Sequence, residues 1–314
     1  MTTTHKLVHG SLMKTVTTTI TDIANKLHTR YQDPILCQQY AWWMLEALTG
    51  KTIAHLLAQK TFTLNSAQQQ TLQLWIDQQI KRHIPLQYLL GNVPFADLEI
   101  LVEPPTLIPR PETEEWAIKL AEQLNRLTNK KIAILDIATG SGCIALALAK
   151  QLPHATVWGS DISEKAIVLA KKNAQHNTIT NASFLVSDIF GNIPLQVQFD
   201  IIVSNPPYIS LEEWKQLDTS VTTWEDKNAL VANNDGLKII ESIISGALHY
   251  IKKNTEFEQK NIPQLIIEIG YRQGKSVKKL MEQYGYTNVV IHKDLEKKDR
   301  VVSGSIPHVA KEKQ

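Results

Sequence analysis

The chain has 314 residues, of which 43% are hydrophobic and 20% are charged, and its formal net charge is +2. This composition is typical of a soluble globular protein, and the nearly neutral charge argues against stable binding to nucleic acid. The apolar runs are too short to span a membrane. Cys37 and Cys143 are far apart and fit no metal-ligand spacing, so we expect a reduced, cytoplasmic protein without a metal site.

The length suits one catalytic domain with a smaller domain before it, and residues 1–84 read as that smaller domain. Apolar residues recur there at helical spacing, which predicts helices over 17–27, 35–48, 52–57 and 67–82. Ser66 to Gln69 resembles a capping box at the start of the last helix. The segment contains no cluster of catalytic side chains. We therefore expect a helical domain that recognises a protein substrate.

Residues 85–108 change to an extended pattern. Leu86–Gly91 and Ala96–Val102 are strand-like and are separated by Gly91 and Asn92, which predicts a β-hairpin that connects two domains. A helix should then begin at Pro111, because proline suits the first helical position and Glu112 favours the positive end of the helix dipole. We take residues 109–314 as the catalytic domain.

Within this domain, strands alternate with helices. The apolar runs predict strands over 131–137, 156–160, 183–186, 199–204, 264–270, 287–291 and 301–306. Such alternation is typical of an α/β fold with a doubly wound, mostly parallel sheet. Ligands of these sheets bind beyond the carboxyl ends of the strands, so the residues that follow each strand are the candidates for a site.

Three of these strand ends carry residues that suit a nucleotide. The first strand runs into a glycine-rich turn, the second ends at Asp161, and the third is followed by Asp188 and Ile189. Glycines allow the backbone to approach a ligand closely, and an acidic residue at the end of the second strand can bind ribose hydroxyls. The glycine pattern also satisfies the dinucleotide fingerprint of dehydrogenases, so alone it does not identify the ligand.

The fourth strand ends at Asn205-Pro206-Pro207-Tyr208. The prolines stop the strand and hold Asn205 extended, so the Asn205 side-chain oxygen and the Pro206 carbonyl become available as acceptors. Together with the flat ring of Tyr208, they suit a planar group that carries an –NH2. A dehydrogenase transfers a hydride and needs no group that holds an –NH2, so this motif argues against a dehydrogenase. The alternative is that the motif is only a turn.

With these motifs, the chain resembles the class I S-adenosylmethionine-dependent methyltransferases. Within them it resembles the protein-(glutamine-N5) methyltransferases that modify peptide chain release factors. The matching stretches are Pro85–Gly91, Leu107–Glu114, Asp136–Ile144, Asn205–Tyr208, Ala229–Leu230, Asp235–Leu237 and Glu268–Gly270. The resemblance implies a Rossmann-like, seven-stranded methyltransferase domain that is preceded by a helical bundle and a β-hairpin.

The resemblance also implies roles for individual residues, with S-adenosylmethionine as the cofactor. It assigns the methionine part of the cofactor to Ala138, Thr139, Gly140, Ser141 and Gly142, the ribose to Asp161, and the adenine to Asp188 and Ile189. Asn205, Pro206, Pro207 and Tyr208 match the glutamine clamp, in which Asn205, Pro206 and Tyr208 are catalytic and Asn205 also borders the cofactor. Arg110 and Glu112 match an element near the mouth of the site.

The chain departs from the family pattern at three places. Ala138 stands where the family usually has glycine, so we expect the loop to avoid a positive φ there. Ile189 replaces a frequent aromatic residue beside the adenine. Glu225-Asp226 replaces a usual Glu-Pro pair.

The implied enzyme is a cytoplasmic monomer whose partner is a release factor. Three alternatives remain open from the sequence. The target glutamine could belong to a ribosomal protein, the clamp could hold adenine N6 of DNA or RNA, or the chain could be a binding module without activity.

Overall fold

The computed structural model describes residues 15–59, 61–126, 131–233, 236–253, 257 and 260–307. Residues 1–14, which begin the expected helical domain, lie outside the described residues. The chain divides into two compact units, Met1–Leu90 and Gly91–Gln314. In the part of the chain that the structure describes, no helix is long and apolar enough to cross a membrane.

The first unit is helical. Its described elements are α1 (Val16–Tyr31), α2 (Pro34–Thr49), α3 (Ile53–Leu57), α4 (Ser66–Arg82) and α5 (Leu86–Leu90). The predicted helices over 17–82 are confirmed, and their apolar faces form one core around Leu27, Met44 and Leu56. The capping box lies one residue earlier than predicted, because the side chain of Asn65 accepts from the backbone N–H of Gln68.

The predicted strand over Leu86–Gly91 is wrong, since this segment forms α5 and buries Leu86 in the helical core. A short apolar run does not distinguish a strand from a helix by its periodicity. The hairpin follows instead as β1 (Asn92–Phe95) and β2 (Leu98–Leu101). Its turn residues Ala96 and Asp97 have φ values of 48° and 62°, as a two-residue hairpin turn requires.

The hairpin belongs to the second unit. The side chain of Asn173, on helix α8 (Glu164–His176), accepts from the backbone N–H of Leu101 at 2.7 Å and donates to its carbonyl at 3.0 Å. These bonds satisfy an otherwise open edge of β2. The hairpin is therefore packed on the catalytic unit.

The described residues of the second unit contain one sheet of seven strands, in the order β5-β4-β3-β6-β7-β9-β8. The strands are β3 (Ala133–Ile137), β4 (Thr156–Asp161), β5 (Ala182–Val186), β6 (Ile201–Ser204), β7 (Leu265–Glu268), β8 (Thr287–Lys293) and β9 (Asp299–Ser305). Strands β3 to β7 pair in parallel, and β9 pairs antiparallel with both β7 and β8. The predicted α/β fold with a mostly parallel, seven-stranded sheet is confirmed.

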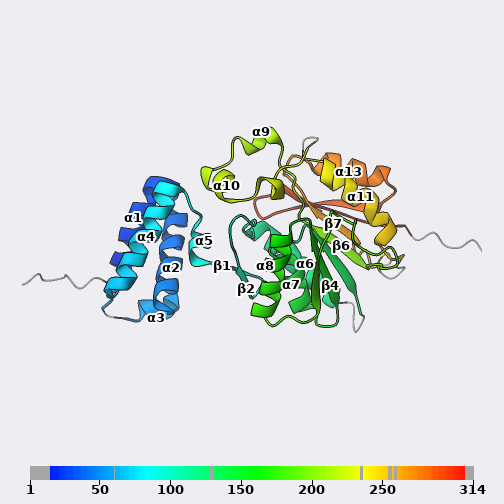
Figure 1. Ribbon diagram of the computed structural model, residues 1–314. Coiled ribbons are helices and arrows are strands. Elements are labelled where there is room, and N and C mark those ends of the chain that lie inside the picture. The colour runs from blue at the N-terminus through cyan, green and yellow to red at the C-terminus, as the bar shows by residue number, and fades with distance from the viewer. Residues whose placement is uncertain are drawn as a thin grey trace, which may run out of the picture. The chain divides into compact units, whose positions relative to one another are not determined.

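Helices cover both faces of this sheet (Figure 1). One face carries α8 with α6 (Pro111–Asn125) and α7 (Cys143–Gln151), and the other carries α11 (Lys238–Tyr250) and α13 (Gly274–Gln283). Between β6 and α11, the chain forms the short helices α9 (Leu211–Trp214), α10 (Thr219–Trp224) and η1 (Lys227–Ala229), which the sequence patterns did not predict.

The chain crosses from one side of β3 to the other, because β3 lies between β4 and β6. In doubly wound sheets this switch point leaves a crevice at the carboxyl ends of the central strands. The residues that follow β3, β4 and β6 meet there.

Candidate functional site

A cavity of about 530 Å³ lies at the carboxyl ends of β3, β4 and β6. Its wall brings together the sequence-predicted residues Ala138, Gly140, Asp161, Asp188, Ile189, Asn205 and Pro207. Apolar side chains from other segments, among them Leu107, Ile162 and Ile239, complete the wall. A mostly apolar cavity with a few convergent polar groups is the usual form of a cofactor site.

The glycine-rich loop after β3 turns sharply under this cavity. Ala138, Gly140 and Gly142 all have a positive φ, of 58°, 55° and 84°. The expectation that the loop avoids a positive φ at Ala138 is therefore wrong. The loop keeps this path because the N–H of Thr139 donates to Ser160 O at 2.9 Å, and its hydroxyl donates to Asp136 Oδ2 at 2.6 Å.

Thr139, Ser141 and Gly142 belong to the same loop but do not line the cavity. Thr139 and Ser141 are buried, and a Cβ added at Gly142 would lie 3.0 Å from the Cβ of Ala170 on α8. These residues hold the loop against the sheet and α8. Ala138 and Gly140 are the members of the predicted set that face the cavity.

Asp161, at the end of β4, is held by two backbone groups. Its Oδ2 accepts from the N–H of Gly140 and its Oδ1 accepts from the N–H of Ser163, both at 2.9 Å. Burial raises the pKa of this carboxyl, and the nearby carboxylate of Asp226 adds to the rise. Each carboxylate oxygen has a further lone pair, so the group can still accept from the two hydroxyls of a ribose.

Asp188 and Ile189 follow β5 and also line the cavity. Ile189 has a φ of 49°, which is uncommon for a β-branched residue, and its carbonyl accepts from the Ser187 hydroxyl at 3.1 Å. This strained turn presents an apolar side chain to the cavity, where a flat apolar ring can pack.

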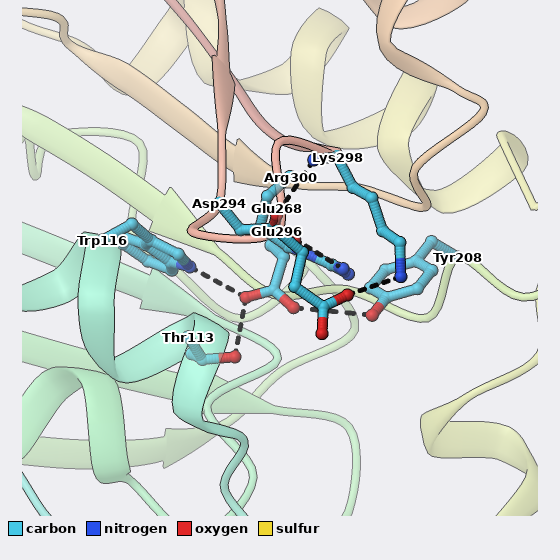
Figure 2. A network of polar contacts seen from close by, with 8 residues as sticks. All are labelled: Thr113, Trp116, Tyr208, Glu268, Asp294, Glu296, Lys298 and Arg300. Carbon is cyan, nitrogen blue, oxygen red and sulfur yellow. Dashed lines mark hydrogen bonds and ion pairs between the residues drawn. The ribbon is translucent and has the colours of Figure 1, made fainter.

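Asn205 lies where β6 ends, and its side chain reaches α6. Its Nδ2 donates to the Thr113 hydroxyl at 3.2 Å. The Thr113 hydroxyl in turn donates to Glu268 Oε2 at 2.7 Å, and the indole N–H of Trp116 donates to the same oxygen at 2.8 Å. Figure 2 shows Thr113 and Trp116 converging on the Glu268 carboxylate.

Pro206 and Tyr208 do not line the cavity, whereas Pro207 does. Pro206 is buried, and the Tyr208 hydroxyl lies 3.5 Å from Glu268 Oε1 (Figure 2). A hydrogen bond holds the backbone of the motif in place, since the side chain of Gln273 donates to the Tyr208 carbonyl at 2.9 Å. A Cβ at Gly236 would lie 1.9 Å from that carbonyl oxygen, so glycine is required there.

Arg110 and Glu112 also lie off the cavity wall. Arg110 Nη2 contacts both carboxylate oxygens of Glu225, at 2.6 and 2.7 Å, and the Glu225 side chain is only 1% exposed. This ion pair ties the start of α6 to the segment between β6 and α11. Glu112 faces a separate hollow of about 370 Å³, together with Trp116 and Arg300.

The sequence motifs indicated no role for Thr113, Trp116, Glu268 or Asp226. Thr113 and Glu268 both lie in stretches that carry the family resemblance, and Glu268 ends a buried strand. Thr113 contacts Asn205, which is 92 residues away, and Glu268, which is 155 residues away, and no local pattern reveals either contact. Among the described residues, no group of three histidine, cysteine or acidic residues could hold a metal ion.

Comparisons with known proteins agree with this arrangement. A family model described as a methyltransferase domain matches residues 128–299, and one described as the PrmC N-terminal domain matches residues 27–91. A release factor glutamine methyltransferase of Flavobacterium psychrophilum is 41% identical over 231 residues, covering 71% of this chain and 76% of its own. Another, of Lactococcus lactis, is 36% identical over 267 residues, covering 84% of this chain and 92% of its own.

Proposed function

Since the chain belongs to the family of release factor glutamine methyltransferases, we propose that it methylates N5 of a glutamine side chain in a peptide chain release factor, with S-adenosylmethionine as the methyl donor. The observation that carries the proposal is the position of Asn205, whose amide lies on the cavity wall at the end of β6. Family membership favours the release factor over a ribosomal protein or an adenine base as substrate.

The cavity has the size and the donor set for S-adenosylmethionine. Asp161 would accept from the ribose hydroxyls, Asp188 and Ile189 would border the adenine, and Ala138 and Gly140 would pass the methionine part. When bound, the cofactor supplies an electrophilic methyl group on a sulfonium sulfur. The positive φ at Gly140 turns the backbone so that no side chain stands between the loop and the ligand.

A glutamine amide nitrogen is a weak nucleophile because its lone pair is delocalised into the carbonyl. Asn205 Oδ1 and the Pro206 carbonyl would accept its two hydrogens, which fixes the nitrogen and stabilises the positive charge that it gains as the new bond forms. Most of the rate would come from this positioning and charge placement. Forming this bond would break the bond between the methyl carbon and sulfur and leave a neutral thioether, and the methylated nitrogen would then release one proton to solvent water to become a neutral secondary amide.

Tyr208 would pack its ring beside the substrate, while its hydroxyl stays near Glu268. Arg110 and Glu112 stand at the start of α6, and we keep them as candidates for contact with the protein substrate. We assign recognition of the release factor to the helical unit Met1–Leu90, and we propose that the enzyme works in the cytoplasm as a monomer.

Asn205→Ala tests this function. The variant should bind S-adenosylmethionine within a few-fold of the unmodified chain but lose ~100-fold or more in single-turnover methylation of a release factor, the scale for one positioned transition-state hydrogen bond. Asn205→Asp changes the charge and should also retain little activity. Asn125→Ala, near the far end of α6, is the control and should react at the unmodified rate. Near-normal methylation by Asn205→Ala would reduce the motif to a turn.

A further inference from the structure

The Asn205 side chain is the first member of a chain of hydrogen bonds that ends at the indole N–H of Trp116. The identity of the donor in each of these bonds follows from Trp116. An indole N–H can only donate. It donates to Oε2 of Glu268, a residue at the end of β7 that is 1% exposed. The same oxygen accepts from the hydroxyl of Thr113, a residue that is 2% exposed. Both contacts require Glu268 Oε2 to act as an acceptor (Figure 2).

Thr113 has a single hydroxyl hydrogen, and Glu268 takes it. The Thr113 oxygen can therefore only accept from its other neighbour, the Asn205 side chain at 3.2 Å. This places the amide nitrogen of Asn205 at Thr113. Turning the amide over would put its oxygen against an oxygen that has no hydrogen left to give. The amide oxygen of Asn205 consequently points away from α6, on the side of the cavity.

We propose that Thr113, backed by Glu268 and Trp116, is a positioning residue that holds the Asn205 amide with its oxygen toward the substrate. The inference rests on the proposed function, because the orientation matters when the substrate offers an –NH2 group. A turned Asn205 would present its own –NH2 to that group, donor against donor. Thr113 does not contact the substrate, but it determines that the substrate meets the amide oxygen of Asn205 and not its –NH2 group.

The buried carboxylate also strengthens the clamp. Burial raises the pKa of Glu268, whereas the hydrogen bonds from Trp116 and Thr113 lower it. In a hydrogen-bond chain each bond polarises the next, so donation by Asn205 into this chain makes the Asn205 oxygen a better acceptor. The titratable groups that face Glu268 are Glu112 on α6, Arg300 on β9 and the Tyr208 hydroxyl. Arg300 is itself paired with Asp294, at 3.0 Å and 3.1 Å (Figure 2).

Two substitutions of Thr113 separate positioning from packing. Thr113→Val keeps the shape and removes the hydroxyl, whereas Thr113→Ser keeps the hydroxyl and removes the methyl group. We expect Thr113→Val to lose ~10–100-fold in single-turnover methylation of a release factor at saturating S-adenosylmethionine, and Thr113→Ser to stay within ~3-fold. A residue that only fills space would give the reverse order. Cofactor affinity, measured by calorimetry, should be unchanged in both.

A double-mutant cycle locates the effect at Asn205. Thr113→Val should cost nothing further in an Asn205→Ala background, since the group that it orients is gone. Glu268→Gln is the second variant, for the case in which Thr113→Val does not fold. In this variant the indole N–H of Trp116 would donate to the oxygen of the new side-chain amide. The Thr113 hydroxyl could then still donate to that oxygen and accept from Asn205, so most activity should remain.

The outcomes distinguish this inference from the function on which it rests. Methylation by Thr113→Val at the unmodified rate, or an equal loss in Thr113→Ser, would overturn the positioning role while the unmodified chain stays active. Loss of methylation in Glu268→Gln as complete as in Asn205→Ala would also overturn it. If the unmodified chain methylates no release factor, the proposed function itself fails and this inference fails with it.

Discussion

Ala138→Gly should stabilise the catalytic unit, although it removes a side chain. Ala138 has a φ of 58°, where a Cβ costs about 1–2 kcal/mol. Glycine removes this strain but loosens the unfolded chain, which takes back about 0.4–1 kcal/mol. The expected net gain is therefore about 0.5–1 kcal/mol in the free energy of unfolding. In a unit of this size, such a gain raises the melting temperature by about 1–4 °C.

Two neighbouring glycines provide matched controls in the same loop. Gly140 has a φ of 55°, and a Cβ there would meet nothing within 4 Å, so Gly140→Ala introduces the strain alone and should lose about 0.5–1 kcal/mol. Gly142→Ala adds a close contact of 3.0 Å with the Ala170 Cβ and should lose more. The three variants should therefore rank Ala138→Gly, Gly140→Ala, Gly142→Ala in decreasing stability.

Urea unfolding of the cofactor-free protein, with parallel thermal scans, measures these differences. If Ala138→Gly is less stable than the unmodified chain, or if Gly140→Ala costs nothing, the loop does not hold positive φ values at these positions.

Three further predictions concern charged groups. Burial raises the pKa of Asp136 to about 7 from an ordinary 3.8, so the folded chain keeps this carboxyl protonated at pH values where the unfolded chain has lost the proton. The free energy of unfolding of the unmodified chain should therefore fall, relative to that of Asp136→Asn, as pH rises from about 4 to about 7. The same pH dependence of this free energy in both chains, measured by urea unfolding, would contradict the prediction. Asp161→Ala should weaken S-adenosylmethionine binding by roughly 1–3 kcal/mol in calorimetry, and an unchanged affinity would remove Asp161 from the ribose site. Arg110→Ala leaves the Glu225 carboxylate buried without its cation, which should cost about 2 kcal/mol in thermal unfolding, with Arg110→Lys in between; a neutral Arg110→Ala would contradict the pairing.

The sheet and most of the larger helices could be predicted because their apolar residues are the ones that are buried, so the pattern of apolar residues in the sequence follows the pattern of burial. Runs such as Ile201–Ser204 and Leu265–Glu268 are buried on both faces, and an uninterrupted apolar run is the mark of a central parallel strand. The polar groups at the strand ends, Asp161 and Asn205, could be placed at one edge for the same reason. Topology alone then brings them to a common cavity.

The errors and omissions have local causes as well as long-range ones. The Leu86–Leu90 run packs into the helical core, and this tertiary contact decides its conformation where periodicity does not. Ala138 accepts a positive φ because Thr139 is tied to Asp136 and Ser160, which lie in neighbouring strands. The orientation of Asn205 depends on Thr113 and Glu268, which are remote in sequence and meet only in the folded chain.

The most direct test of the proposed activity is to map the methyl group that the chain transfers. Purified chain is incubated with a release factor and methyl-labelled S-adenosylmethionine, and the release factor is digested and sequenced by mass spectrometry. The label should lie on the side-chain amide of a glutamine and should be absent when Asn205→Ala replaces the unmodified chain. Label on another type of residue, label on nucleic acid only, or no label with the unmodified chain would contradict the assignment.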